Sequence, residues 1–269
     1  KMVLADRVNA AVTLIFNNYW NYGGWINVFG VILYSIQLYA DFSGGIDITI
    51  GVAQMFGITM DENFRQPYFS RSISEFWRRW HITLGTWMKD YIFYPFSLSK
   101  CMNKFGKWCK KTFGNNIGKL LPVSLANLLV FFIVGIWHGA AWKYIMYGMY
   151  NGVIIAASGM LAPVYAKMAP DLYAANVMLA ETFTKAHLSQ ISMATVKAVG
   201  LSVQDLIIVG VGCLIIFIVS LLKEKGMNIR ETIAQKNIAV RWIIYIAFIM
   251  FILIYGSTAT TSDFIYANF

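Results

Sequence analysis

The sequence predicts an all-α, polytopic integral membrane protein. Of its 269 residues, 58% are hydrophobic and only 13% are charged, whereas about 25% of the residues in an ordinary soluble domain are charged. Runs without any charge recur along the chain, and their lengths suit helices that cross a bilayer. Lysines and arginines gather between these runs. The net charge of +9 therefore relates to membrane topology and to contact with anionic lipid headgroups. It gives no reason to expect a nucleic-acid partner.

The first part of the chain predicts helices that are broken by polar turns. We expect a short helix, a turn, and then a span over Trp25 to Tyr39. The segment Asp41–Gly45 (DFSGG) should end that span, and Ile46 to Phe56 should form another short helix. Glycines and carboxylates at membrane depth are typical of broken or re-entrant helices that line a cavity. A polar surface loop is the alternative for Asp41.

An amphipathic helix is predicted next. It should run from Ser72, the N-cap of a capping box with Glu75, to about Tyr94, where a proline should stop it. Aromatic residues recur along it at helical spacing, but it is too charged for a simple span and should lie in the membrane interface. His81 follows Trp77 by four residues and shares the apolar face. A buried, hydrogen-bonded histidine is the alternative to a functional one.

The remaining chain predicts further spans joined by basic segments. Lys100 to Lys119 contains six lysines and no acidic residue, which makes it a cytoplasmic loop by the positive-inside rule. A second basic segment, Lys223–Arg241, joins the last two spans. One more crossing between Pro163 and Gln204 would place it in the cytoplasm too, yet no apolar run there is long enough to span a bilayer. An irregular crossing, a missing segment and a wrong parity are all open. The predicted spans are Leu121–Trp142, Tyr144–Ala162, Leu206–Leu222 and Trp242–Gly256.

A histidine lies near the end of the span that should begin at Pro122. The segment Gly135–Gly139 (GIWHG) contains His138, and an ionisable side chain within a span usually faces a cavity or a partner. A neutral histidine that bonds between helices is the alternative. The three cysteines show no metal-ligand spacing, so no metal site is predicted. The chain has no Walker-type loop and no G-x-S-x-G motif, which argues against a nucleotide-driven pump or a soluble hydrolase.

Taken together, four stretches resemble the membrane-bound O-acyltransferase (MBOAT) family. The similarity is to the bacterial branch that includes the alginate O-acetylation protein and the D-alanyl transferase of teichoic acids. The last residues of the chain resemble the end of that branch, whereas the family's N-terminal helices are absent. Because the chain also opens without Met, we expect residues 1–269 to be a single membrane domain from a longer protein. The four stretches are Asp41–Gly45 (DFSGG), Glu62–Tyr68 (ENFRQPY), Ser72–Leu84 (SISEFWRRWHITL) and Gly135–Gly139 (GIWHG).

The resemblance implies that an acyl group moves from a cytoplasmic thioester to a hydroxyl. The family's invariant histidine maps to His138, which would act as the base, and a second histidine maps to His81, which would orient or polarise. A narrow tunnel would exclude water that could hydrolyse the thioester. No bound cofactor is implied, and the donor would be acetyl-CoA or a carrier-protein thioester. The residues implied for the tunnel are Trp77, Trp80, Trp137 and Asp41, with a structural role as the alternative for Asp41.

We therefore predict acyl transfer, with acetyl as the expected group, to a cell-envelope polysaccharide at the cytoplasmic membrane. Family members of this branch work with an extracytoplasmic partner protein, so we expect one here. D-Alanyl transfer to teichoic acid is the nearest alternative and differs in its donor. From other classes, a transporter or flippase would also use broken helices, and a non-catalytic scaffold would need neither histidine beyond folding.

Overall fold

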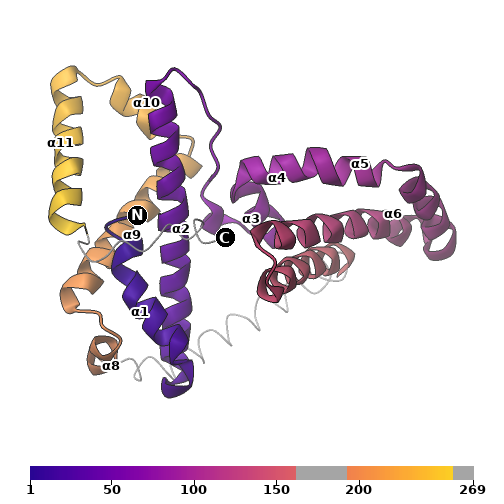
Figure 1. Ribbon diagram of the computed structural model, residues 1–269. Helices are drawn as coiled ribbons and strands as arrows, with labels where there is room; N and C mark the ends of the chain where they lie inside the picture. The colour runs from indigo at the N-terminus through magenta and orange to yellow at the C-terminus, as the bar shows by residue number, and fades with distance from the viewer. Residues whose placement is uncertain (162–192, 257–269) are drawn as a thin grey trace. The chain divides into compact units, whose positions relative to one another are not determined.

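The computed structural model describes residues 1–161 and 193–256. In these ranges the regular secondary structure is helical and contains no strand (Figure 1), which confirms the predicted all-α class. The described residues form two compact units, one of residues 1–60 and 193–256 and one of residues 61–161. The expected single membrane domain stays a prediction.

Helices α1 and α2 form a hairpin at the core of the first unit (Figure 1). A Cβ atom added to Gly30 of α2 would lie 2.8 Å from Cγ2 of Ile15 in α1, so the two helices approach at a glycine. Val8 of α1 shares one apolar cluster with Leu33 of α2 and Val209 of α9. The helices of this unit are α1 (Ala5–Asn17), α2 (Gly24–Met55), α8 (Met193–Ala198), α9 (Val203–Glu224), α10 (Ile229–Ala234) and α11 (Ile238–Tyr255).

The predicted break at residues 41–45 is wrong. Helix α2 continues through the DFSGG segment as one helix of 32 residues. Each glycine costs a helix interior about 0.5–1 kcal/mol relative to alanine, which is too little to interrupt a long helix that packs against a neighbour. Within this helix, Asp41 is buried at 1% exposure and paired with Lys1, with 2.8 Å between Nζ and Oδ1.

Helix α6 (Lys100–His138) of the second unit folds back on itself at Gly114, where φ is 78° and ψ is 173°. The arms on either side of this turn touch. A Cβ atom on Gly118 would lie 2.6 Å from the backbone nitrogen of Lys110, and one on Gly106 would lie 3.5 Å from Cγ of Pro122. The glycine turn therefore sets the start of the apolar arm, and the prediction that a helix begins at Pro122 is wrong.

The lysine-rich segment is the first arm of α6 rather than a loop. Four of its lysines recur at i, i+4, i+7 and i+11, so they share one face of the helix. All four are exposed, while Met102 and Cys109 on the opposite face are buried. This face can therefore remain hydrated or reach headgroups while the other face packs. The four lysines are Lys100, Lys104, Lys107 and Lys111.

A second hairpin joins α6 to the helix over residues 142–161. A Cβ atom on Gly148 would overlap the carbonyl oxygen of Phe131, and one on Gly135 would lie 2.8 Å from the carbonyl oxygen of Tyr144. The two backbones thus meet at glycines, as small residues allow in membrane helices. Gly139 begins the connection with φ of 142°, a conformation that side chains rarely adopt.

Four described helices are long and apolar enough to cross a membrane. They contain most or all of each predicted span over residues 25–39, 121–142, 206–222 and 242–256. The predicted return span, Tyr144–Ala162, is helical as far as residue 161, where this part of the description ends. The uncertain crossing between Pro163 and Gln204 lies mostly outside the described residues. The four helices are Gly24–Met55, Ile117–His138, Val203–Glu224 and Ile238–Tyr255.

Replacing Gly148 with alanine should destabilise the full-length protein. The added methyl group would overlap a backbone oxygen of α6, and overpacking of this kind costs about 1–3 kcal/mol. The matched control is Gly159→Ala in the same helix, where nothing lies within 4 Å of the added atom. Thermal unfolding in detergent should give a lower midpoint for Gly148→Ala and an unchanged or higher one for Gly159→Ala. Equal midpoints for the two variants would contradict the close packing.

Candidate active site

The predicted helix from Ser72 to Tyr94 is interrupted at the first candidate histidine. Helix α3 (Ile73–Arg79) ends at Trp80, whose backbone is extended (φ −106°, ψ 128°). His81 follows in the left-handed conformation (φ 46°, ψ 54°), and α4 (Ile82–Met88) then begins. A left-handed conformation costs a non-glycine residue about 1–3 kcal/mol and persists only where its surroundings impose it. The prediction of one continuous helix is therefore wrong at the residue of most interest.

Residues 63–65 stabilise the non-helical backbone at this break by pairing with it. Phe64 and Trp80 form an antiparallel bridge. On either side of it, Arg65 N–H donates to the carbonyl of Arg79 at 2.9 Å, and Ile82 N–H donates to the carbonyl of Asn63 at 3.0 Å. These bonds satisfy backbone groups that the helix loses at the break. The ENFRQPY stretch thus acts on the histidine through the backbone.

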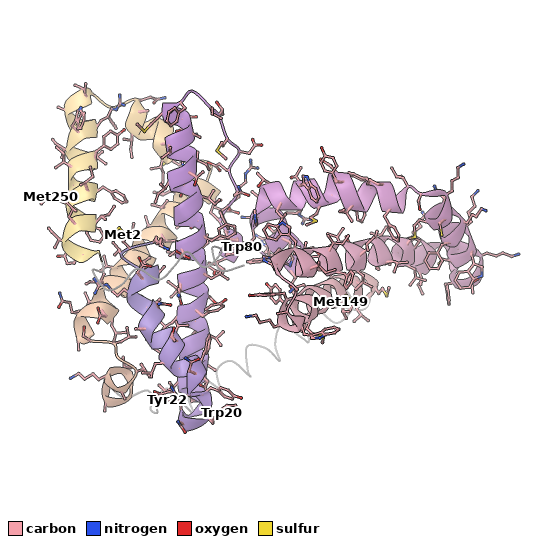
Figure 2. The ribbon with its side chains drawn as sticks, viewed as in Figure 1. Met2, Trp20, Tyr22, Trp80, Met149 and Met250 are labelled. Carbon is pink, nitrogen blue, oxygen red and sulfur yellow. The ribbon has the colours of Figure 1, made fainter. Side chains whose placement is uncertain are left out.

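An aromatic cluster supports the same junction. Trp80, labelled in Figure 2, is 6% exposed. Its ring meets the edge of Phe64 with centroids 5.0 Å apart and stacks on Phe76 at 5.5 Å. The residue directly before His81 is therefore fixed by aromatic packing on both Phe64 and Phe76.

Ser72 caps α3 as predicted, but Glu75 bonds to the backbone of Arg71 instead of that of Ser72. Ser72 Oγ accepts a hydrogen bond from the backbone N–H of Glu75 at 3.1 Å. The Glu75 carboxylate accepts from the N–H of Arg71 and pairs with Arg79 at 2.7 Å. The bond from the N–H of Arg71 lowers the pKa of Glu75, burial partly opposes that change, and the hydrogen bond and charge of Arg79 lower the pKa further. At the other end, the prediction that the helix stops near Tyr94 is wrong. Helical structure continues from α4 through a π-helical turn (Lys89–Phe93) into α5 (Tyr94–Ser97), because Pro95 falls in the first turn of α5, where a missing N–H is tolerated.

The side chain of Asn63 joins three groups beyond the break. Its Oδ1 lies 3.1 Å from Nδ1 of His81, 3.1 Å from the backbone nitrogen of Thr83 and 2.7 Å from Oγ1 of Thr83. Asn63 is only 7% exposed, so its side chain is held inside the unit. One buried amide thus connects the histidine to the first turn of α4.

His81 is neutral at neutral pH. Burial, and then the nearby His138, lower its pKa from 6.5 to about 4. An uncharged imidazole has one nitrogen that donates and one that accepts. His81 can therefore accept a proton or a hydrogen bond without first losing a proton.

His138 is the last residue of α6, at the tip of the glycine-packed hairpin. The ring of Trp137 lies 4.9 Å from that of His138 and 6.1 Å from that of His81, between centroids. Tyr144, at the start of the next helix, lies 6.4 Å from His138. The structure therefore brings together two histidines that are 57 positions apart in the sequence (138 − 81).

A second contact places α3 against the face of α6 that carries His138. The rings of Trp77 and Phe131 meet edge to face at 5.4 Å, and Phe131 precedes His138 by seven residues, which is two helical turns. Trp77 Nε1 is buried and has no hydrogen-bond partner among the described residues. Trp137, in contrast, is 50% exposed.

The predicted site residues divide between the two units. His81, His138 and the three tryptophans lie in the unit of residues 61–161. Asp41 lies in the other unit, where it pairs with Lys1, and the structure does not place it with the histidines. Asp47 pairs with Arg230 at 3.2 Å in the same unit as Asp41. His187 lies outside the described residues.

Sequence reasoning missed Asn63 and Thr83 as neighbours of the histidine. Asn63 is 18 positions before His81, in a stretch predicted only as a polar turn. The contact arises from antiparallel pairing around a helix break, which neither helical periodicity nor spacing indicates. The family resemblance contained the stretch but not its role.

Comparison with protein families decides the identity of the fold. A model of the membrane-bound O-acyltransferase family matches residues 13–178. The chain belongs to this family. That match includes both histidines and Asn63, and it confirms the resemblance seen in the sequence motifs.

Several relatives of this family member are about two fifths identical to it over part of their length. A probable alginate O-acetylase of Azotobacter vinelandii is 39% identical over 127 residues, which are 47% of this chain and 22% of that protein. A peptidoglycan O-acetyltransferase of Helicobacter pylori is 40% identical over 123 residues, 46% and 20% of the two chains. A teichoic acid D-alanyltransferase of Bacillus subtilis is 39% identical over 122 residues, 45% and 28%. The matched part thus spans between a fifth and three tenths of these relatives.

Acidification should remove stability that depends on neutral His81. The pKa of His81 is about 4 in the folded protein and about 6.5 in an unfolded chain, so the unfolded chain binds the proton first. Stability should therefore fall as the pH falls from about 6.5 to 4, and this contribution should be constant outside that window.

The measurement compares thermal unfolding midpoints of the wild type and His81→Gln between pH 4 and 8. The wild type should lose more than the variant within the window, and the other histidines serve as an internal control because both proteins contain them. Identical pH dependence in the two proteins would count against the lowered pKa.

Proposed function

We propose that this chain is the core of an O-acyltransferase that moves an acyl group, acetyl in our assignment, from a cytoplasmic thioester to hydroxyls of a cell-envelope polysaccharide. The observation that carries the proposal is the proximity of His81 and His138, with the ring of Trp137 near both. It is supported by membership of an acyltransferase family and by relatives whose names refer to envelope polymers.

In the proposed reaction, His138 is the general base. Its ring takes the proton of the acceptor hydroxyl while the hydroxyl oxygen forms a bond to the thioester carbonyl carbon. The carbon–sulfur bond breaks, and the leaving thiolate takes up the proton that His138 removed. His81 orients the reacting groups beside it. The sequence around His138 contains no serine or cysteine in a nucleophile motif, which favours direct transfer over a covalent acyl-enzyme.

We further propose a tunnel that keeps water from the thioester. Trp137 and Trp77 are its best candidates, because Trp137 is half exposed beside both histidines and the buried N–H of Trp77 is free to bind a ligand. Trp80 supports the break from behind, packed on Phe64 and Phe76. Asp41 takes no part in this site in our proposal.

D-Alanyl transfer to teichoic acid is the second candidate. The Bacillus subtilis D-alanyltransferase is as similar to this chain as the Azotobacter protein is, at 39% identity. The two reactions differ in donor, acetyl-CoA or acetyl thioester in one case and a D-alanyl carrier-protein thioester in the other. Both need a base beside a thioester, so the histidine pair serves either.

The proposed setting is the cytoplasmic membrane, with the thioester on the cytoplasmic side. An extracytoplasmic partner protein would pass the acyl group to the polysaccharide. The exposed lysine face of α6 supports this orientation, because basic segments stay on the cytoplasmic side.

Loss of His138 should abolish acyl transfer. Cells would carry the full-length protein as wild type, His138→Ala, His81→Ala or His187→Ala, and transfer of labelled acetyl to envelope polymer would be measured at equal membrane levels. We expect a loss of at least about 100-fold for His138→Ala, since general base catalysis contributes about 10²–10⁴-fold. A smaller loss is expected for His81→Ala and none for His187→Ala, the matched control.

Three results would overturn parts of this proposal. Normal transfer by His138→Ala would remove it as the base. Label from a D-alanyl thioester but none from acetyl-CoA in the wild type would select the second candidate. No transfer from either donor would exclude the acyltransferase activity.

Cys101 reports on the orientation of the lysine face. It is exposed in the first arm of α6, whereas Cys109 is buried. A membrane-impermeant maleimide should label Cys101 in inside-out vesicles and not in spheroplasts, and Cys101→Ser should lose that label. Labelling of Cys101 in intact spheroplasts would place this arm outside and contradict the proposed topology.

A further inference from the structure

The side chain of Asn63 touches both His81 and the helix that follows it. Its carbonyl oxygen Oδ1 accepts the backbone N–H of Thr83 at 3.1 Å. A backbone N–H only donates, so the atom at this position is the oxygen of the amide rather than its nitrogen. The same oxygen accepts the hydroxyl of Thr83 at 2.7 Å.

This assignment fixes the protonation pattern of His81. Oδ1 only accepts, so Nδ1 of His81, 3.1 Å away, must carry a proton to bond with it. In a neutral imidazole the other nitrogen then holds a lone pair. Nε2 is therefore a hydrogen-bond acceptor and a proton acceptor, and it cannot donate.

We propose that Asn63 is a positioning residue that holds His81 as the Nδ1–H tautomer and thereby makes Nε2 a lone-pair acceptor in the site. This inference rests on the proposed function, because it names the role of His81 in that reaction. His81 would accept a hydrogen bond from the acceptor hydroxyl or from the N–H of His138. Polarisation of the thioester carbonyl by neutral His81 is excluded, since that role needs a donor.

The backbone of Asn63 supports the same assignment. Its carbonyl accepts the N–H of Ile82 at 3.0 Å, while its side chain bonds to the residues on either side of Ile82. Asn63 is 7% exposed, so it has little freedom to turn away. Main chain and side chain of one residue therefore hold the left-handed backbone and the ring of His81 together.

Groups from three parts of the chain surround the His81 ring. Asn63 precedes α3, Thr83 lies in α4 and shares the Oδ1 atom, and His138 and Trp137 end α6. His138 is the titratable group whose charge opposes protonation of His81. A carboxylate in place of the Asn63 amide would add an opposite charge at hydrogen-bond distance, which raises the pKa of a histidine by about 1–3 units.

The test uses Asn63→Asp, which keeps the accepting oxygen and the shape, and Asn63→Leu, which removes the acceptor. The matched control is Asn115→Asp, the same chemical change at an exposed position beside the α6 turn. Diethylpyrocarbonate reacts with unprotonated imidazole, so its rate at His81, followed by mass spectrometry against pH, gives the titration midpoint without any need for activity.

We expect the midpoint of His81 to lie near pH 4 in the wild type and Asn115→Asp, and about 1–3 pH units higher in Asn63→Asp. Acyl transfer by Asn63→Asp should then fall on lowering the pH to 6, relative to pH 8, by about twofold more than in the wild type, because about half of His81 is protonated if its pKa rises by about 2. In Asn63→Leu, transfer should fall at every pH.

An unchanged His81 midpoint in folded Asn63→Asp would overturn the inference, since the carboxylate would then not be bonded to the ring. Wild-type transfer rates in folded Asn63→Leu would overturn it as well. If the wild type transfers no acyl group from any donor, the proposed function fails, yet the modification midpoint still decides whether Asn63 holds His81. The two failures are therefore distinguishable.

Discussion

The antiparallel pairing of residues 63–65 with the break at Trp80 and His81 is the constraint on which the candidate site depends. Without those backbone bonds, the SISEFWRRWHITL stretch would be expected to form the continuous helix that its spacing predicts, and His81 would be one more residue on an apolar face. With them, the chain pauses in an extended and then a left-handed conformation. The strain of about 1–3 kcal/mol is offset by two backbone hydrogen bonds, three side-chain bonds to Asn63 and the stacking of Trp80.

His138 is fixed by a different device. Its hairpin is closed by backbone contact at Gly135 and Gly148, which leaves little room for the helix end to shift. A rigid helix end and a supported helix break thus each present one imidazole, and the ring centroid of Trp137 lies 4.9 Å from that of His138 and 6.1 Å from that of His81. Such support on rigid elements is what holds catalytic groups within the small tolerances that proton transfer requires.

The sequence predicted the all-α class, much of each described span and both histidines, because these follow from composition, run length and motif resemblance. Two of its errors have the same physical origin. The glycines and carboxylate of Asp41–Gly45 predicted a break where α2 is continuous and Asp41 is buried and paired. Helical spacing predicted a continuous helix at His81, where pairing with residues 63–65 breaks it. Both outcomes depend on contacts between residues far apart in the chain. Asn63 was missed for the same reason, since no periodic pattern links it to His81.

The two imidazoles also constrain each other. Burial, and then the charge of a protonated His138, oppose protonation of His81, so the doubly protonated site is disfavoured. In the proposed reaction a single proton leaves the hydroxyl and later joins the thiolate, so one protonated histidine at a time is all that the chemistry requires. In the proposed tautomer, Nδ1 of His81 is bonded to Asn63, so Nε2 is an acceptor of fixed orientation, while His138 takes up and releases the proton of the hydroxyl. That asymmetry explains how two residues of one type could take different roles.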